Sequence, residues 1–164
     1  MFVLGIDPGL TRTGYGIIES VGGTMRPVTA GVIRTDAQAP TARRLAELHA
    51  DIGSVLDDYP IDSAAIEQVF INLNRGTAMA VARASGVVMA TIADRGIAVA
   101  EYTPSQMKLT VTGSGSADKE QVAAVVALRL GIGGVGGPAD VADALGIALC
   151  HIQHAGQPMG SVAR

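Results

Sequence analysis

The sequence predicts one α/β domain, in which a mixed five-stranded sheet carries helices on both faces. Its first third contains three β-rich segments, and the rest alternates helix-type and strand-type segments. The chain has 164 residues, 48% of them hydrophobic, which is enough for one sizeable core and too little for two full-sized domains. We therefore expect a single domain over residues 1–155 and a disordered C-terminal tail over residues 156–164.

The three early segments predict an antiparallel meander. Residues 2–6 are almost entirely apolar and end at the turn Asp7-Pro8-Gly9, as expected for a strand that is buried on both faces. Residues 13–19 and 28–33 are also β-rich, and Gly22-Gly23 separates them. This arrangement places Asp7 at the carboxyl end of a central strand.

The later segments alternate between helix and strand patterns. Residues 41–56 carry apolar side chains at intervals of three or four, which predicts an amphipathic helix ending before Tyr59-Pro60. We then expect a strand, a long Ala- and Gly-rich helix, a second strand and two further helices, at residues 63–70, 73–93, 97–102, 106–111 and 116–130. Pro138 suits the start of a last helix. This order is that of a ribonuclease-H-like fold.

Composition excludes several classes of protein. Gly, Pro or charged residues interrupt the apolar runs before the roughly 18 to 20 residues that a membrane span requires, so we expect no membrane association. The single cysteine, Cys150, excludes an internal disulfide framework, and the N-terminus lacks a signal peptide, so we expect a cytoplasmic protein. A net charge of −3 excludes an all-round basic coat but allows a local basic groove.

Four carboxylates occupy positions where an ionised side chain needs a partner. Asp7 and Glu67 interrupt strand patterns that otherwise indicate burial, where an unpaired charge is costly. Asp140 and Asp143 are three residues apart at the start of the last helix, so they share one face, and the helix N-terminus favours their charge. Carboxylates around two divalent ions are a known arrangement for cutting phosphodiesters.

Other interpretations of these residues remain open. Taken one at a time, each acid also has a purely structural explanation: Asp7 as a turn residue, Glu67 as an ion-pair partner, Asp140 as a helix cap and Asp143 as a solvated side chain. A zinc site of Cys and His type lacks ligands, because the chain has one cysteine and three histidines. Oxygen coordination of Mg²⁺ or Mn²⁺ is therefore favoured. The pair His151 and His154, at helical spacing, remains an alternative.

Four separated blocks of the sequence resemble the RuvC Holliday-junction resolvases, in that family's order. They are GIDPG with TGYG, AIEQVF, QMKLTVTGSGSADKEQV and DVADALGIALCH. The resemblance runs from about Met1 to about His154. It implies a homodimer that binds a four-way DNA junction and nicks two strands of like polarity symmetrically, in recombination and repair. It also implies RuvA and RuvB, the branch-migration proteins, as partners.

Carried over by motif, the resemblance assigns Asp7, Glu67, Asp140 and Asp143 as catalytic metal ligands. It implies two Mg²⁺ ions per subunit, for which Mn²⁺ may substitute. Some family members have His in place of the first acid of the last motif, whereas this chain keeps Asp140. That difference favours the all-carboxylate version of the site, with Mg²⁺ chemistry.

The resemblance also implies contacts with DNA outside the four acids. Phe70 is expected to stack on an unpaired base at the junction centre. Lys108 and Lys119 match basic positions near the scissile and neighbouring phosphates. Arg12 and Arg75 are further candidates for phosphate contacts, although solvated surfaces carry such residues routinely.

Three rival functions are considered. A related ribonuclease-H-like nuclease that processes structured RNA shares the early DxG motif, but the AIEQVF and SGSADK blocks argue against it. An actin-like nucleotide-binding module would explain DPGLTRTG as a phosphate loop, but such proteins need two domains and a longer chain. A non-catalytic junction-binding module would be expected to have lost at least one of the four acids.

Overall fold

The computed structural model describes residues 1–68 and 75–155. Within these ranges, five strands form one sheet in the order β3-β2-β1-β4-β5, namely β1 (Phe2–Asp7), β2 (Arg12–Val21), β3 (Thr24–Arg34), β4 (Ser63–Glu67) and β5 (Ala98–Tyr102). The helices are α1 (Thr41–Asp58), α2 (Arg75–Ala93), α3 (Pro104–Thr112), α4 (Lys119–Leu130) and α5 (Ala139–Ala155). The predicted tail, residues 156–164, lies outside the described residues.

The sheet is mixed, as predicted. Strand β2 runs antiparallel to both β1 and β3, whereas β4 runs parallel to both β1 and β5. Strands β2 and β3 extend beyond the predicted ranges and meet at Gly22 and Gly23, whose φ angles of 58° and 83° suit a tight hairpin turn. Strand β1 therefore lies at the centre of the sheet, and Asp7 ends it.

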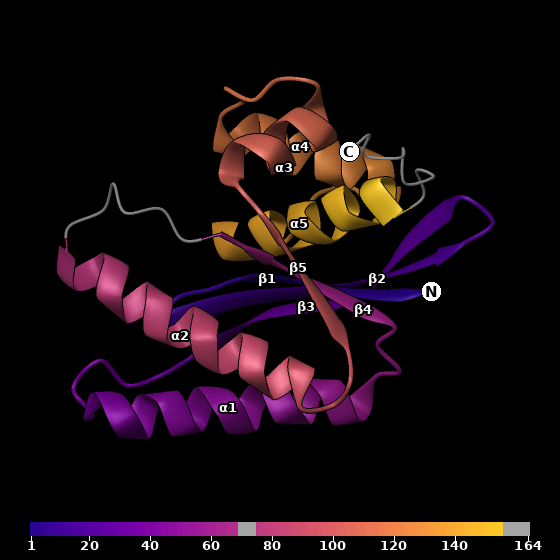
Figure 1. The fold of residues 1–164 in the computed structure, drawn as a ribbon. Helices are drawn as coiled ribbons and strands as arrows, with labels where there is room; N and C mark the ends of the chain where they lie inside the picture. Colours follow the sequence, from indigo (N-terminus) through magenta and orange to yellow (C-terminus); the bar gives the residue numbers. More distant parts are fainter. Residues whose placement is uncertain (69–74, 156–164) are drawn as a thin grey trace, which may run out of the picture.

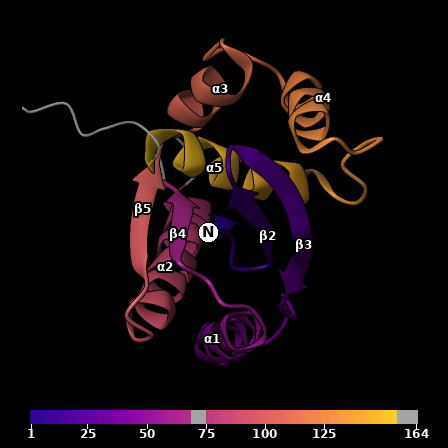
Figure 2. The same cartoon turned by 90° about the vertical axis from the view of Figure 1, so that its right-hand side faces the viewer.

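Helices cover both faces of the sheet (Figure 1). Helices α1 and α2 lie on one face, and α5 lies on the other with α3 and α4 packed over it (Figure 2). Alternate residues of β1 supply the two cores, because successive side chains of a strand point to opposite faces. Leu4 and Ile6 pack with Leu48 and Ile92, while Val3 belongs to the core on the α5 side.

One expectation from composition needs correction. The 18-residue window Gly76–Ala93 of α2 has a mean hydropathy of 1.3, so by length and composition it passes the test for a membrane span. Gly and Arg83 interrupt it but do not lower its hydropathy enough to exclude it. The same helix buries Ala84, Val88 and Ile92 in the core beside α1. One such helix is weak evidence for a membrane span, since a core helix of a globular domain gives the same signal.

Candidate active site

Asp7 and Glu67 come together because two parallel strands end side by side. Strands β1 and β4 pair with Ile6 opposite Ile66, and each acid is the next residue along its chain. Neighbouring strands are about 4.8 Å apart, so the two carboxylates leave the sheet as near neighbours. The central, apolar character of both strands thus brings these acids to one edge of the sheet.

Helix α5 brings Asp140 and Asp143 to the same edge. The helix lies so close to the sheet that a Cβ atom at Gly5 would meet the backbone of Ala144 and Ala148, and one at Gly14 would meet the backbone of Asp140. Gly14 is paired with Asp7 across β1 and β2. Glycine in these strands therefore permits the approach that places the first turn of α5 beside Asp7.

The four carboxylates act on one another electrostatically. The pKa of Asp7 is raised from 3.8 to about 8, mainly by burial and then by the charges of Glu67, Asp143 and Asp140, in that order of importance. Burial, followed by the charge of Asp143, raises the pKa of Glu67 from 4.5 to about 7. The structure therefore confirms that acids far apart in the sequence gather in one place, and that gathering them is unfavourable without neutralisation.

Two basic side chains partly neutralise this cluster. Arg12 Nη2 lies 2.6 Å from Asp140 Oδ2, and Lys119 Nζ lies 3.2 Å from Asp143 Oδ2. The charge of Asp143 and its hydrogen bond raise the pKa of Lys119, so this ammonium group stays protonated. Lys119 is fixed at the start of α4 by a capping box in which Asp118 and Gln121 bond each other's backbone N–H groups.

The cluster has the donor chemistry of a divalent metal site. Asp140 Oδ2 is buried and makes no hydrogen bond despite its short distance to Arg12. In residues 1–68 and 75–155 no group of three or more His, Cys, Asp or Glu side chains is arranged so that it could hold a metal ion. Asp140 instead contacts Arg12, and Asp143 contacts Lys119. All the potential ligands at this edge are carboxylates, which suit Mg²⁺ or Mn²⁺.

The two histidines of α5 lie away from the acids. His151 Nδ1 is 3.0 Å from the hydroxyl of Tyr102, and His154 Nδ1 is 2.8 Å from the carbonyl oxygen of Cys150. Eleven residues of helix, about 16 Å, separate His151 from Asp140. The alternative metal pair of His151 and His154 therefore does not belong to this site.

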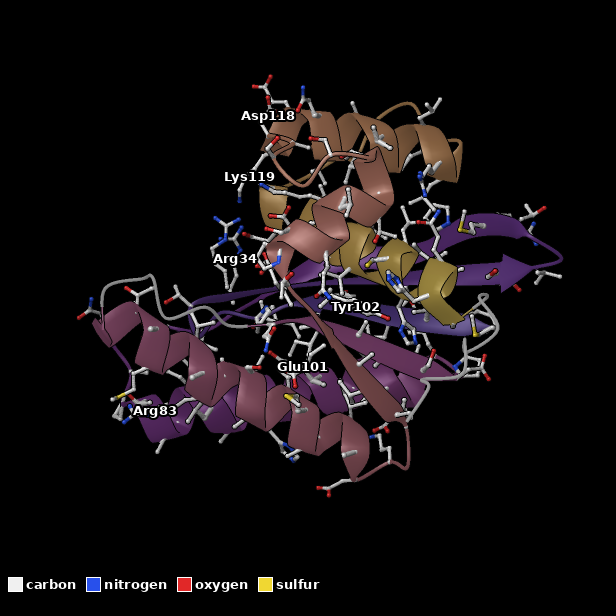
Figure 3. All side chains as sticks on the ribbon, turned by 45° about the horizontal axis from the view of Figure 1, so that its top comes forward. Arg34, Arg83, Glu101, Tyr102, Asp118 and Lys119 are labelled. Carbon is white, nitrogen blue, oxygen red and sulfur yellow. The ribbon has the colours of Figure 1, made fainter. Side chains whose placement is uncertain are left out.

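The predicted DNA-contacting residues have different positions. Lys119 and Arg12 lie in the site. The charge of Lys108, on α3, offsets a small part of the rise in the pKa of Glu67 that burial and Asp143 cause. Helix α2 begins at Arg75, whose side chain is not among those described, and Phe70 lies outside the described residues. Arg83 is exposed on α2, far from Lys119 in Figure 3.

Sequence reasoning missed two arginines near this edge. Arg34 ends β3 directly opposite Arg12, and Figure 3 shows it on the same side of the molecule as Lys119. Arg44, in the first turn of α1, is only 9% exposed. Its position was detectable, because Arg44 precedes Leu48 and Ile52 by four and eight residues and so lies on the buried face of that helix.

Comparisons with known proteins agree with this geometry. Residues 3–151 match the family model described as "Crossover junction endodeoxyribonuclease RuvC". Curated proteins of that name from Streptomyces avermitilis and Desulforamulus reducens are 49% and 42% identical, over 94% and 93% of this chain and 89% and 94% of theirs.

A solved structure is similar over nearly the whole fold. "T. thermophilus RuvC in complex with Holliday junction substrate" is 35% identical, with a TM-score of 0.89 over 94% of each chain. This likeness confirms the ribonuclease-H-like fold. The acid cluster at the ends of β1 and β4 thus lies in a chain that belongs to the RuvC family of crossover junction endodeoxyribonucleases.

Proposed function

We propose that this chain is an Mg²⁺-dependent endonuclease that resolves four-way DNA junctions by paired, symmetric nicks. The observation that carries the proposal is the pKa of Asp7, raised from 3.8 to about 8 by burial and by three neighbouring acids. Such a cluster needs protons or cations to neutralise it. Divalent cations are the neutralising partners that phosphodiester hydrolysis employs.

The carboxylates fit the proposed metal. Asp7, Glu67, Asp140 and Asp143 would hold two Mg²⁺ ions, or Mn²⁺ in their place. The bound ions would supply an activated water and stabilisation of the departing oxygen. The buried Asp140 Oδ2, which has no hydrogen bond, supports this assignment, since an oxygen in that state has lone pairs free for a ligand.

The basic residues of the site have two tasks in this proposal. Arg12 and Lys119 hold Asp140 and Asp143 in place. Both have N–H groups left over for phosphate oxygens, because an ammonium has three donors and a guanidinium five. Lys108 adds positive charge on the side of Glu67. The electrostatics of the site thus favour a polyanion once cations are bound. By resemblance, Phe70 and Arg75 would add contacts at the junction.

We further propose that the enzyme is a homodimer joined through α2. Paired nicks require two active sites, and each chain supplies one. The outer face of α2 carries Met79, which is 57% exposed, and exposed Ala82, Gly86 and Ala90. Apart from Arg83, which is exposed among them, these residues are apolar, and most are small enough to allow another helix to approach closely. A two-fold axis through it would give an isologous dimer, which is the commonest kind.

Family membership supports two further expectations. The branch-migration proteins RuvA and RuvB would deliver the junction to this enzyme. We also expect the reaction to take place in the cytoplasm, where chromosomal DNA and free Mg²⁺ are present.

The proposal is tested by offering three substrates to the purified protein: a synthetic four-way junction, a linear duplex of the same arms and a structured RNA. Each is incubated with Mg²⁺ and with EDTA. We expect symmetric nicks in the junction alone, and only with the metal. Cleavage of the RNA would favour the RNA-processing alternative, and nicking in EDTA would exclude the metal mechanism.

A further inference from the structure

A pocket of about 420 Å³ opens beside the loop that follows Asp7. Its wall combines the loop of residues 9–12 with Arg44 of α1 and with Thr77, Ala80 and Val81 of α2. None of its lining residues is acidic. The pocket therefore lies near the edge of the sheet that carries the acids, on the face covered by α1 and α2. The loop of residues 9–12 separates it from the acids.

Arg44 is a buried cation with neutral partners. Its Nε donates to Thr35 Oγ1 at 2.9 Å and its Nη2 donates to Thr11 Oγ1 at 2.7 Å. Among residues 1–68 and 75–155 it forms no ion pair. The remaining segments, VFINLN and GQPMGSVAR, contain no Asp or Glu side chain that could compensate it.

A buried guanidinium without a counter-ion is costly, and such groups are normally paired with an anion. A guanidinium has five N–H donors, of which the two threonines take one each. Its Nη1 atom makes no hydrogen bond to a described residue. The fully buried side-chain atoms without a hydrogen-bond partner do not include it, so Nη1 is not fully buried. These N–H groups are therefore accessible, and the pocket that Arg44 lines is open space beside them.

We propose that this Arg44 pocket binds a backbone phosphate of the DNA strand that is being cut. The inference rests on the function proposed above. Arg12 touches both sites, since it lines the pocket and contacts Asp140. A strand whose scissile phosphate lies at the acids passes over residues 9–12 and presents a neighbouring phosphate to Arg44. Planar, bidentate donors such as Arg suit a phosphodiester group.

The exposed neighbour of Arg44 on α1 provides a matched control. Arg43 pairs with Glu47 on the surface, so Arg43→Gln removes the same charge from the same turn without affecting the pocket. Junction binding is measured in an Asp7→Asn background with Mg²⁺ between 50 and 200 mM salt. The slope of log K against log salt is negative, and each lost phosphate contact reduces its magnitude by about 0.9.

We expect Arg44→Gln to lower that slope by about 0.9 and to weaken binding about tenfold or more, whereas Arg43→Gln leaves the slope unchanged. Arg44→Lys should retain most of the slope. A purely structural role in bracing Thr11 and Thr35 would weaken binding without changing the slope. Equal slopes for Arg44→Gln and Arg43→Gln therefore overturn the proposal.

A second variant keeps the test valid if Arg44→Gln does not fold. Thr77→Phe fills the pocket from α2 and leaves Arg44 and its two threonines intact. It should also lower the slope, and a normal slope would overturn the proposal.

A third measurement distinguishes a DNA phosphate from a small anion. Inorganic phosphate could raise the Tm of the wild type but not that of Arg44→Gln, while both proteins show the same salt slope for junction binding. In that case the pocket binds free anions and the proposal is wrong. Absence of junction binding by every form, including Asp7→Asn alone, would instead refute the proposed function.

Discussion

Arg12 Nη2 lies 2.6 Å from Asp140 Oδ2, and yet this carboxylate oxygen receives no hydrogen bond. The contact is therefore an ion pair without hydrogen-bond geometry. Asp143, on the same helix, is also paired with a cation. Here Lys119 Nζ donates a hydrogen bond of 3.2 Å to Asp143 Oδ2. Two cations of the chain thus stand beside two of the four acids, while Asp7 and Glu67 are left to repel their neighbours.

Asp7→Asn is expected to fold and to bind a four-way junction without nicking it. The amide keeps the size of the carboxylate but removes the charge at the centre of the cluster. We expect the nicking rate with Mg²⁺ to fall by at least about 100-fold, the scale of losing one electrostatic stabiliser in an active site. Glu67→Gln should behave alike. Gel assays of binding and nicking measure both effects.

The exposed Asp51 on α1 offers a matched control for this variant. Asp51→Asn makes the same chemical change away from the site and should nick normally. If Asp7→Asn cleaved at the wild-type rate, the assignment of Asp7 as a metal ligand would be wrong.

The metal-free protein is expected to lose stability as the pH rises from 6.5 to 8. The pKa of Asp7 is about 8 in the folded chain against 3.8 ordinarily, and that of Glu67 is about 7 against 4.5. Both groups hold a proton in the folded state that they lack when unfolded, so unfolding releases protons and the free energy of unfolding falls with rising pH. The decrease from Asp7 is on the order of 2 kcal/mol, or a few degrees in Tm.

Three comparisons check the origin of this pH effect by thermal unfolding in EDTA and in Mg²⁺. The lowered pKa of His151 acts in the opposite direction, but below pH 6.5, outside the chosen range. Asp7→Asn should flatten the curve. Mg²⁺ should raise Tm more at pH 8 than at pH 6.5, because protons compete with the metal for the same oxygens. A metal-free Tm that does not change over this range would contradict the raised pKa values.

The sequence alone predicted the sheet and the four acids because both depend on local patterns. An apolar run that ends in Asp7-Pro8-Gly9 marks a central strand with an acid at its carboxyl end, whatever the rest of the chain does. Asp140 and Asp143 share a helix face by spacing alone. Their meeting with Asp7 then follows from the order of strands and helices, which the structure confirms.

Other features depend on contacts between distant segments and were not predictable. The extension of β3 to residues 24–34 was missed because Pro27 interrupts the β-rich segment, and a proline is tolerated here only because β3 lies at the edge of the sheet. The pairing of Arg12 with Asp140 requires α5 to lie on β2, which depends on the glycines that allow the close approach.

Lys119→Gln is expected to destabilise the metal-free protein and to slow nicking. Asp143 is only 14% exposed, and within residues 1–68 and 76–155 Lys119 is the cation that pairs with it. Lys119 itself is 71% exposed, but its removal leaves a largely buried carboxylate without its cation, which costs more than leaving a better solvated carboxylate unpaired. We expect Tm in EDTA to fall, and Mg²⁺ to restore more stability to the variant than to the wild type.

A surface ion pair supplies the control for Lys119→Gln. Arg26 pairs with Glu19 at 3.3 Å while 70% exposed, and Arg26→Gln should change stability by no more than about 1 kcal/mol. Lys119→Arg should keep the stability of the wild type. Equal losses in Arg26→Gln and Lys119→Gln would mean that Lys119 does not neutralise the acid cluster.

Gly86→Leu is expected to separate the proposed dimer without harming the fold. A Cβ atom at Gly86 meets nothing within 4 Å, so the monomer can accept a side chain on this face of α2. Replacing glycine in a helix interior with a good helix former favours the helix by up to about 1 kcal/mol. The monomer should therefore be at least as stable, whereas a leucine would hold two facing helices apart.

The oligomeric state is measured by sedimentation of wild type and variant over a range of concentrations, together with Tm. Gly133→Leu, at another exposed glycine with open space around it, is the control and should leave the association constant unchanged. A monomeric Gly86→Leu that still binds the junction but no longer makes paired nicks would support α2 as the interface. If Gly86→Leu remains a dimer with the wild-type association constant, the two-fold axis lies on another surface of the chain.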